Sequence, residues 1–222
     1  MDDHDLYGAD YFLKHYQIDP KRHAMYKQEH ARILARVPNM GSVLDIGCGV
    51  GDFLGMFDDR WEKMGFEPSQ YAADVARRKG VVIVHSLEKV EDESVDLVVF
   101  RGTLQHINTP INDLAEATRV LRHTGMLAIL ATPDINSLVY KLWHDLPPLE
   151  APRNWVLFDG HYLSNILRRL GYNDVSILHP YLGTPYARPL SDFSKFFISL
   201  FFGYRKFAFP GNMMEVYARI RS

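Results

Sequence analysis

The segment Ser42–Leu54 reads SVLDIGCGVGDFL, and it decides the fold that the rest of the chain completes. A short apolar run that stops at glycines predicts a buried strand, then a turn, then a helix. The dinucleotide-binding pattern G-x-G-x-x-G would need a third glycine where this chain has Asp52. The pattern is instead D-x-G-x-G-x-G, with Asp45 two residues before Gly47. An acid there suits a cationic ligand, and the glycines let that ligand lie against the backbone.

A second acid follows at an informative distance. The run Lys63–Phe66 predicts another strand, which ends at Glu67, twenty residues after Gly47. An acid about 20 residues beyond such a glycine turn binds ribose in nucleotide-binding sheets. We therefore expect Glu67 to accept hydrogen bonds from both hydroxyls of a ribose.

Four motifs occur in a fixed order. The segments Leu44–Leu54, Gly65–Ser69, Val95–Ile107 and Leu121–Asp134 match LDiGCGxGxfL, GxExs, fDxvxxxxvlEHv and LkpGGxlxixtPn. On these motifs, over roughly residues 10 to 178, the chain resembles class I S-adenosylmethionine-dependent methyltransferases of the subfamily acting on small molecules and saccharides. The resemblance implies S-adenosylmethionine as cofactor and S-adenosylhomocysteine as product. It also implies a Rossmann-like α/β/α sandwich whose seven-stranded, mostly parallel sheet has the order 3-2-1-4-5-7-6, with strand seven antiparallel.

Hydrophobic patterning supports an α/β fold, because alternating strands and helices predict a parallel sheet covered on both faces. Strands are expected at 42–46, 62–67, 81–84, 95–100 and 126–131, and the resemblance adds 175–179 and 214–220. Helices are expected at 11–37 with a break at Asp19-Pro20, from about 52, at 70–79, at 110–121 and at 162–170. A ligand of such a sheet lies outside the carboxyl ends of the strands, at the switch point between strands one and four.

The switch-point rule places Gly47, Glu67, Ser86 and Arg101 around one crevice. With the resemblance, the full set expected to bind the cofactor is Asp45, Gly47, Cys48, Gly49, Glu67, Pro68, Ser86, Leu87, Arg101, Gly102 and Leu104. Three members have competing interpretations. Ser86 and Leu87 hold the adenine or merely begin a helix, and Cys48 is a small apolar residue under the turn rather than a nucleophile.

Three residues are candidates for catalysis. His106 follows strand four, and a histidine there can take a proton from an attacking group or simply pack against the sheet. Many relatives have Glu-His where this chain has Gln105-His106, which removes a carboxylate that could bind metal, and no metal is expected. Asn154 stands where many relatives have histidine, so that role is absent or has moved to His161. Tyr11 is a further candidate near the acceptor.

Two segments fall outside the expected sheet. The aromatic-rich N-terminus predicts a helical lid at about 5–38, and about 180–211 forms an aromatic-rich insertion. The insertion could cover the crevice, form a homodimer interface or touch a membrane surface beside Lys195, Arg205 and Lys206. Both segments are expected to belong to a single domain, 1–222.

Composition narrows the function. With 25 basic and 27 acidic residues the net charge is −2, and without a basic stripe no nucleic acid partner is expected. A single cysteine excludes an internal disulfide, and an acidic N-terminus without a signal peptide predicts a cytoplasmic protein. The expected function is methyl transfer to an oxygen of a small molecule or of a lipid- or carrier-linked saccharide. The alternatives are a catalytically silent cofactor-binding protein and, less favoured, a nucleic acid methyltransferase.

Overall fold

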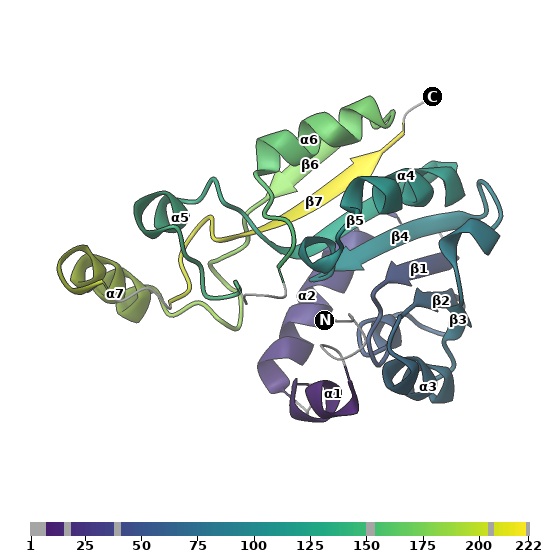
Figure 1. The fold of residues 1–222 in the computed structure, drawn as a ribbon, viewed down its shortest axis with the longest axis horizontal. Coiled ribbons are helices and arrows are strands. Elements are labelled where there is room, and N and C mark those ends of the chain that lie inside the picture. Colours follow the sequence, from purple (N-terminus) through teal and green to yellow (C-terminus); the bar gives the residue numbers. More distant parts are fainter. Residues whose placement is uncertain (1–7, 16–18, 38–40, 150–153, 204–206, 221–222) are drawn as a thin grey trace.

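A seven-stranded sheet forms the centre of the computed structural model, in the order β3-β2-β1-β4-β5-β7-β6 (Figure 1). The structure describes residues 8–15, 19–37, 41–149, 154–203 and 207–220. The strands are β1 Ser42–Ile46, β2 Glu62–Phe66, β3 Val82–Val84, β4 Val95–Arg101, β5 Leu121–Pro133, β6 Asp174–Leu178 and β7 Met213–Arg219. All neighbours pair in parallel except β7, which is antiparallel to both β5 and β6. The predicted fold, strand order and orientation are therefore confirmed.

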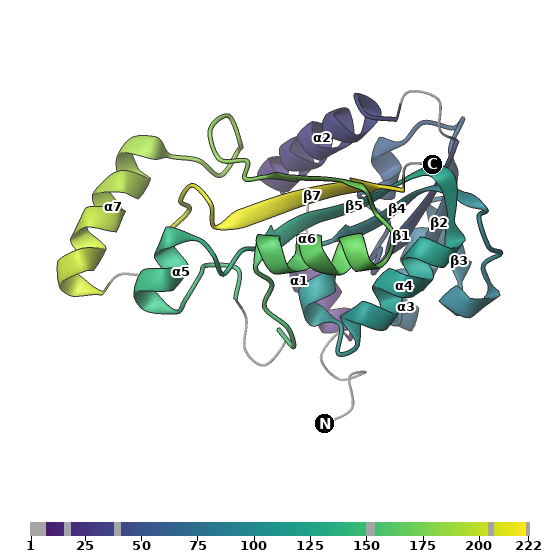
Figure 2. The ribbon, with the colours of Figure 1, turned by 90° about the horizontal axis from the view of Figure 1, so that it is seen from above.

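Helices cover both faces of the sheet (Figure 2). They are α1 Ala9–His15, α2 Pro20–Leu34, α3 Gln70–Arg78, α4 Pro110–Val120, α5 Leu138–Trp143, α6 Gly160–Arg169 and α7 Pro189–Phe202. Alternate residues of each central strand point to opposite faces. Leu44 of β1 therefore belongs to one core cluster with α4 and α6, and Val43 to a second cluster with Ile33 of α2.

Two elements differ from the sequence prediction. The helix expected from about Asp52 is reduced to a 3₁₀ helix, Leu54–Met56, because Gly51 and Gly55 weaken helix formation while the apolar side chains between and after them pack into the core. Strand β5 begins at Leu121, immediately after α4, rather than at Met126. Gly125 lies within this strand, where a Cβ atom would come 2.8 Å from the Arg122 carbonyl oxygen, so it permits a close backbone approach rather than ending a helix.

The N-terminal region divides into two helices, as the Asp19-Pro20 break predicts. The Asp19 side chain accepts a hydrogen bond from the Lys21 N–H at the start of α2. Because Ile33 of α2 is fully buried in the second core cluster, α2 is an integral layer of the domain. The expected lid is thus narrowed to α1, where Phe12 packs against Val50 and Ala72. Residues 5–7, 16–18 and 38 of that expected lid lie outside the described residues.

The aromatic-rich insertion projects from one end of the sheet as α7, beside α5 (Figures 1 and 2). Phe196 of α7 stacks on Phe209 at 4.6 Å between ring centroids, next to the buried Phe207. Near the end of α7, Phe201 and Phe202 are 82% and 83% exposed. Residues 204–206, which include Arg205 and Lys206, lie outside the described residues. Among the helices that are described, none is long and apolar enough to cross a membrane. Three roles remain predictions for this segment: covering the crevice, forming a homodimer interface and contacting a membrane surface.

Candidate active site

The glycine turn after β1 is built from backbone conformations that favour glycine. Gly47, Gly49 and Gly51 have φ values of 79°, 54° and 77°. The Gly47 N–H donates to the Phe66 carbonyl at 2.8 Å, which ties the turn to β2. A Cβ atom on Gly47 would lie 2.3 Å from the Thr103 methyl group, so the loop after β4 also closes onto the turn. The turn is therefore a preformed stretch of backbone held between two strand ends.

Asp45 lies at the end of β1 with its side chain inside the protein. The residue is 2% exposed, and its Oδ1 atom has no hydrogen-bond partner within the described part of the chain. Burial raises the pKa of Asp45 to about 7, although Arg101 acts against this and the carboxyls of Glu67 and Glu29 act with it. A buried acceptor without a partner is costly, so this carboxyl is suited to a ligand that brings a donor.

Glu67 holds the turn from the β2 side. Its Oε2 atom accepts from the Gly49 N–H at 2.8 Å, and its Oε1 atom accepts from the Ser69 N–H at 2.9 Å. Burial raises the pKa of Glu67, and the two backbone hydrogen bonds lower it in part. Since a carboxylate oxygen has two acceptor positions, each oxygen keeps one for a ligand hydroxyl.

Arg101 ends β4 and forms a buried ion pair that the sequence analysis did not find. Its Nε atom lies 2.6 Å from Glu29 Oε2 on α2, and its guanidinium lies over the Tyr26 ring at 4.2 Å. Burial raises the pKa of Glu29, and Arg101 opposes that rise. The signal was present in the sequence, since Glu29 shares one helical face with Tyr26 and Ile33, where an acid needs a buried partner.

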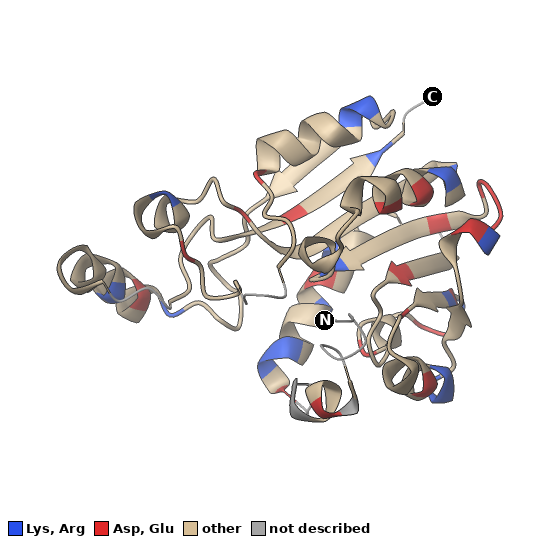
Figure 3. Ribbon diagram, in the orientation of Figure 1, with Lys and Arg blue, Asp and Glu red and all other residues tan. Residues whose placement is uncertain are grey.

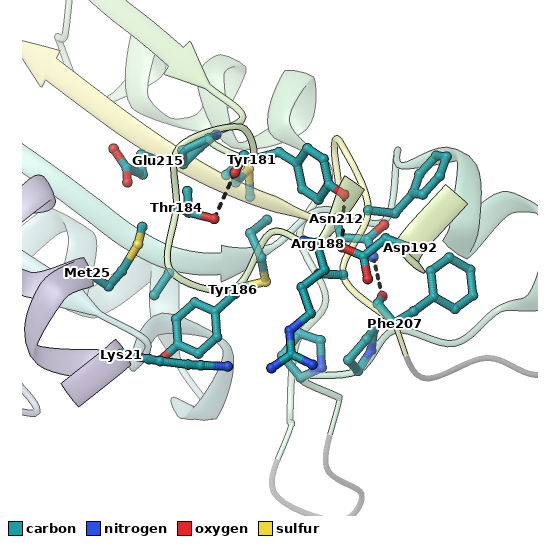
Figure 4. A pocket seen from close by; sticks show the side chains of 18 of the residues that line it. Lys21, Met25, Tyr181, Thr184, Tyr186, Arg188, Asp192, Phe207, Asn212 and Glu215 are labelled. Carbon is teal, nitrogen blue, oxygen red and sulfur yellow. Dashed lines mark hydrogen bonds between the residues drawn. The ribbon is translucent and has the colours of Figure 1, made fainter. Parts of the chain in front are cut away.

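Two cavities adjoin this centre. The larger, of about 610 Å³, lies at the ends of β4, β5 and β7 and reaches the starts of α2 and α7 (Figure 4). The other, of about 570 Å³, lies between α1, α2, the glycine turn and α3, with Phe12 and Val50 in its wall. Arg22 lines both cavities, so they border one another around the first turn of α2.

The remaining expected cofactor residues occupy varied positions. Pro68 is exposed beside Glu67, and Gly102 has a φ of 64° after β4. Ser86 precedes the 3₁₀ helix Leu87–Lys89, and its hydroxyl donates to Glu88. Leu104 is fully buried and Leu87 is 7% exposed, both in the first core cluster. Both leucines therefore belong to the hydrophobic core, and their contact with the cofactor stays a prediction.

Cys48 packs under the turn. A Cβ atom on Gly65 would lie 2.5 Å from the Cys48 sulfur, so the thiol fills the space that this glycine leaves in β2. Burial raises the pKa of Cys48 well above its usual range, which favours the packing interpretation over a nucleophile.

The three catalytic candidates do not converge on one point. His106 is half-buried in the 3₁₀ helix Leu104–His106, with its Nε2 atom 3.4 Å from Gln105 Nε2. His161 is exposed in the first turn of α6, where its N–H donates to Asp159. Tyr11 contacts Phe12 edge to face, on the α1 side. None of the three is among the described residues that line the 610 Å³ cavity.

Tertiary contacts join two regions that the sequence analysis treated separately. The Trp155 N–H donates to the Gln105 carbonyl at 2.9 Å, so the segment beginning at Asn154 lies beside the His106 turn. Asp134, at the end of β5, is 2.8 Å from His179 Nε2 and joins β5 to the chain after β6. Within the part of the chain that is described, no group of three or more acidic, histidine or cysteine residues could hold a metal ion.

The charges around the crevice are distributed unevenly (Figure 3). Acids occur at the ends of β1 and β2, and basic residues occur in the first turn of α2.

A match to a known family shows to which class of protein this chain belongs. Residues 18–177 match the family described as "Methyltransferase domain". This chain belongs to that methyltransferase family. Solved methyltransferases with this fold are S-adenosylmethionine-dependent, so the cofactor inferred from the glycine turn is confirmed at the level of the family.

Individual relatives agree with this assignment. An uncharacterised 37.1 kDa protein of transposon TN4556 from Streptomyces fradiae is 34% identical over 140 residues, which cover 57% of this chain and 38% of that protein. A possible histamine N-methyltransferase from Thermotoga maritima has a TM-score of 0.65 at 20% identity, covering 96% of this methyltransferase and 93% of that chain. A methyltransferase from Archaeoglobus fulgidus has a TM-score of 0.63 at 18% identity, covering 88% and 93%. These solved structures establish the fold alone.

Proposed function

We propose that this methyltransferase binds S-adenosylmethionine at the carboxyl ends of β1, β2 and β4 and methylates an oxygen of a small molecule or of a lipid- or carrier-linked saccharide. One observation carries the cofactor site. The buried, unpartnered carboxyl of Asp45 lies beside a glycine turn that Glu67 holds in place. The cofactor ends in an α-amino group and an adenosine, and this site offers an acid to each part.

The residues present fit that cofactor. Asp45 accepts from the ammonium group, which satisfies its Oδ1 atom and compensates for its burial. Glu67 uses its remaining acceptor positions for the two ribose hydroxyls. The backbone of Gly47 and Gly49 allows close approach, and Ser86 with Pro68 borders the adenine.

The acceptor extends from the 610 Å³ cavity beside Arg101 toward the turn after β4 that carries His106, which lies outside the cavity lining. The cofactor supplies an electrophilic methyl group to an in-line nucleophile, so the chain's tasks are to align the acceptor, exclude water and remove a proton. His106 is the proposed base, and α1 is the proposed cover that excludes water. His161 and Tyr11 are weaker candidates for the base, because His161 is exposed and Tyr11 packs on the α1 side.

Calorimetry with the full chain tests the cofactor site. S-adenosylmethionine and S-adenosylhomocysteine should bind at micromolar concentrations, whereas NAD should not bind. Equal binding of NAD would contradict the assignment of the turn.

Turnover is tested separately. The metabolites and glycans of a strain that lacks the gene are compared with those of its parent, and the comparison seeks a compound that lacks one methyl group in the deletion strain. Cofactor binding without any lost methylation would favour the catalytically silent alternative.

A further inference from the structure

The carboxylates that line the 610 Å³ cavity are already bonded within the protein. Three occur among the described residues: Glu29 pairs with Arg101 at 2.6 Å, Glu215 pairs with Arg32 at 2.5 Å, and Asp192 accepts from the Tyr181 hydroxyl at 2.9 Å and the Arg188 N–H at 2.8 Å. All three residues are at most 3% exposed. Glu29 and Glu215 are each paired with an arginine and Asp192 is bonded to a hydroxyl and a backbone N–H, so all three are engaged in holding the walls together.

The basic residues of the cavity are placed differently. Lys21 and Arg22 lie in the first turn of α2, Arg188 immediately precedes α7, and Lys195 lies in the middle of α7. Lys21 and Arg188 are exposed, and neither forms an ion pair within the described residues. Figure 4 shows their charged ends pointing toward one another across the cavity. Like charges gathered in a concave site raise the local concentration of an anion.

A buried acceptor atom gives independent evidence for a polar ligand. Asn212 is 3% exposed and lines the same cavity. Its Nδ2 atom donates to the Phe207 carbonyl at 3.3 Å, while its Oδ1 atom has no partner within the described residues. An unsatisfied buried amide oxygen is costly, and a hydroxyl of the acceptor would satisfy it.

Part of the cavity wall is aromatic. Phe207 and Phe209 line the cavity and continue into the aromatic cluster under α7. The cavity thus joins a basic rim, one polar acceptor atom and an aromatic wall.

We propose that the methyl acceptor carries an anionic group, a phosphate or a carboxylate, which Lys21 and Arg188 bind, together with an apolar part that lies against Phe207 and Phe209. This proposal rests on the proposed function, because it takes the cavity to be the acceptor site. A phosphate or carboxylate occurs both on lipid-linked acceptors and on free small molecules, and the experiment separates these two sources.

The test measures binding to the full chain saturated with S-adenosylhomocysteine. The probes are octyl phosphate below its micelle concentration, inorganic phosphate, and octyl glucoside as the uncharged analogue. Octyl phosphate should bind more tightly than octyl glucoside, and added salt should weaken its binding. Stronger binding of octyl phosphate than of inorganic phosphate assigns a lipid-linked acceptor. Equal binding of the two phosphates would indicate a free anionic acceptor without an apolar part and would overturn the contact with Phe207 and Phe209.

Charge reversal identifies the residues. The double variant Lys21→Glu, Arg188→Glu should weaken octyl phosphate binding by at least about tenfold. Lys27→Glu is the matched control, since Lys27 is exposed on the same helix and does not line the cavity, and it should bind as the wild type does. Binding of S-adenosylhomocysteine by every variant checks that the site is folded.

Three outcomes would overturn the proposal: equal affinity of the wild type for octyl phosphate and octyl glucoside, equal affinity for octyl phosphate and inorganic phosphate, or no greater weakening by the Lys21/Arg188 variant than by the Lys27 variant. Failure of the wild type to bind S-adenosylhomocysteine would instead overturn the proposed function, so the two failures are distinguishable.

Discussion

Replacing Asp45 with asparagine should stabilise the protein at alkaline pH while weakening its cofactor site. The pKa of Asp45 rises from 3.8 to about 7 on folding, chiefly through burial. A shift of roughly three units corresponds to about 4 kcal/mol. Because the folded state holds the proton more tightly, stability falls as pH rises from about 4 to about 7, and the full cost is present above that range. The asparagine removes this cost, but its buried amide lacks a hydrogen-bond partner and lowers the free energy of unfolding by about 1 to 3 kcal/mol.

Urea unfolding at pH 5 and pH 8 measures the effect. We expect Asp45→Asn to be more stable than the wild type by about 1 to 3 kcal/mol at pH 8, and to show little or no gain at pH 5. Asp96 provides a contrasting control. Burial opposes its ionisation, but hydrogen bonds from Arg122, Gly41 and Ser42 outweigh burial and lower its pKa. Asp96→Asn should therefore lose stability at pH 8. A loss of the same size for Asp45→Asn would refute the ligand-binding interpretation of Asp45.

The same carboxyl should control the pH dependence of cofactor binding. Asp45 must lose its proton to pair with an ammonium group, so S-adenosylhomocysteine should bind the wild type about tenfold more tightly at pH 8 than at pH 6. Asp45→Asn should bind roughly tenfold to a hundredfold more weakly at pH 8. Its affinity should also lose the dependence on pH. Calorimetry at the two pH values provides both numbers.

Three further predictions follow from the site. Glu67→Ala removes the anchor of the Gly49 N–H and the acceptor for ribose, so S-adenosylhomocysteine affinity should fall at least about tenfold by calorimetry, and unchanged affinity would remove Glu67 from the site. His106→Ala should lower turnover by about 10² to 10⁴ with cofactor affinity retained, whereas a packing role predicts a lower melting temperature and normal turnover per folded molecule. Arg101→Met leaves the buried Glu29 carboxylate unpaired and should cost about 3 to 5 kcal/mol in urea unfolding, most of which adding Glu29→Gln should restore.

Much of the fold could be predicted because its signals are local. The D-x-G-x-G-x-G turn requires positive φ at Gly47, Gly49 and Gly51, and all three glycines have it. Strand β1 lies at the predicted residues, because a short apolar run bounded by a glycine turn has few other structures available. The 3₁₀ helix at Leu54–Met56 and the early start of β5 were missed, since packing against distant elements overrode local propensity there.

The sequence by itself determined the class of fold and the cofactor, and it singled out the two acids that we propose bind that cofactor, because all of these depend on spacing along one strand-turn-helix unit and its neighbour. Tertiary structure alone decided which charges meet. Glu29 with Arg101, Arg32 with Glu215, and Lys21 opposite Arg188 are each separated by more than seventy residues of chain, and only the folded sheet brings them together. Whether a charge is buried and paired or is left for a ligand depends on its partners in space, and no local pattern in the sequence records that distance.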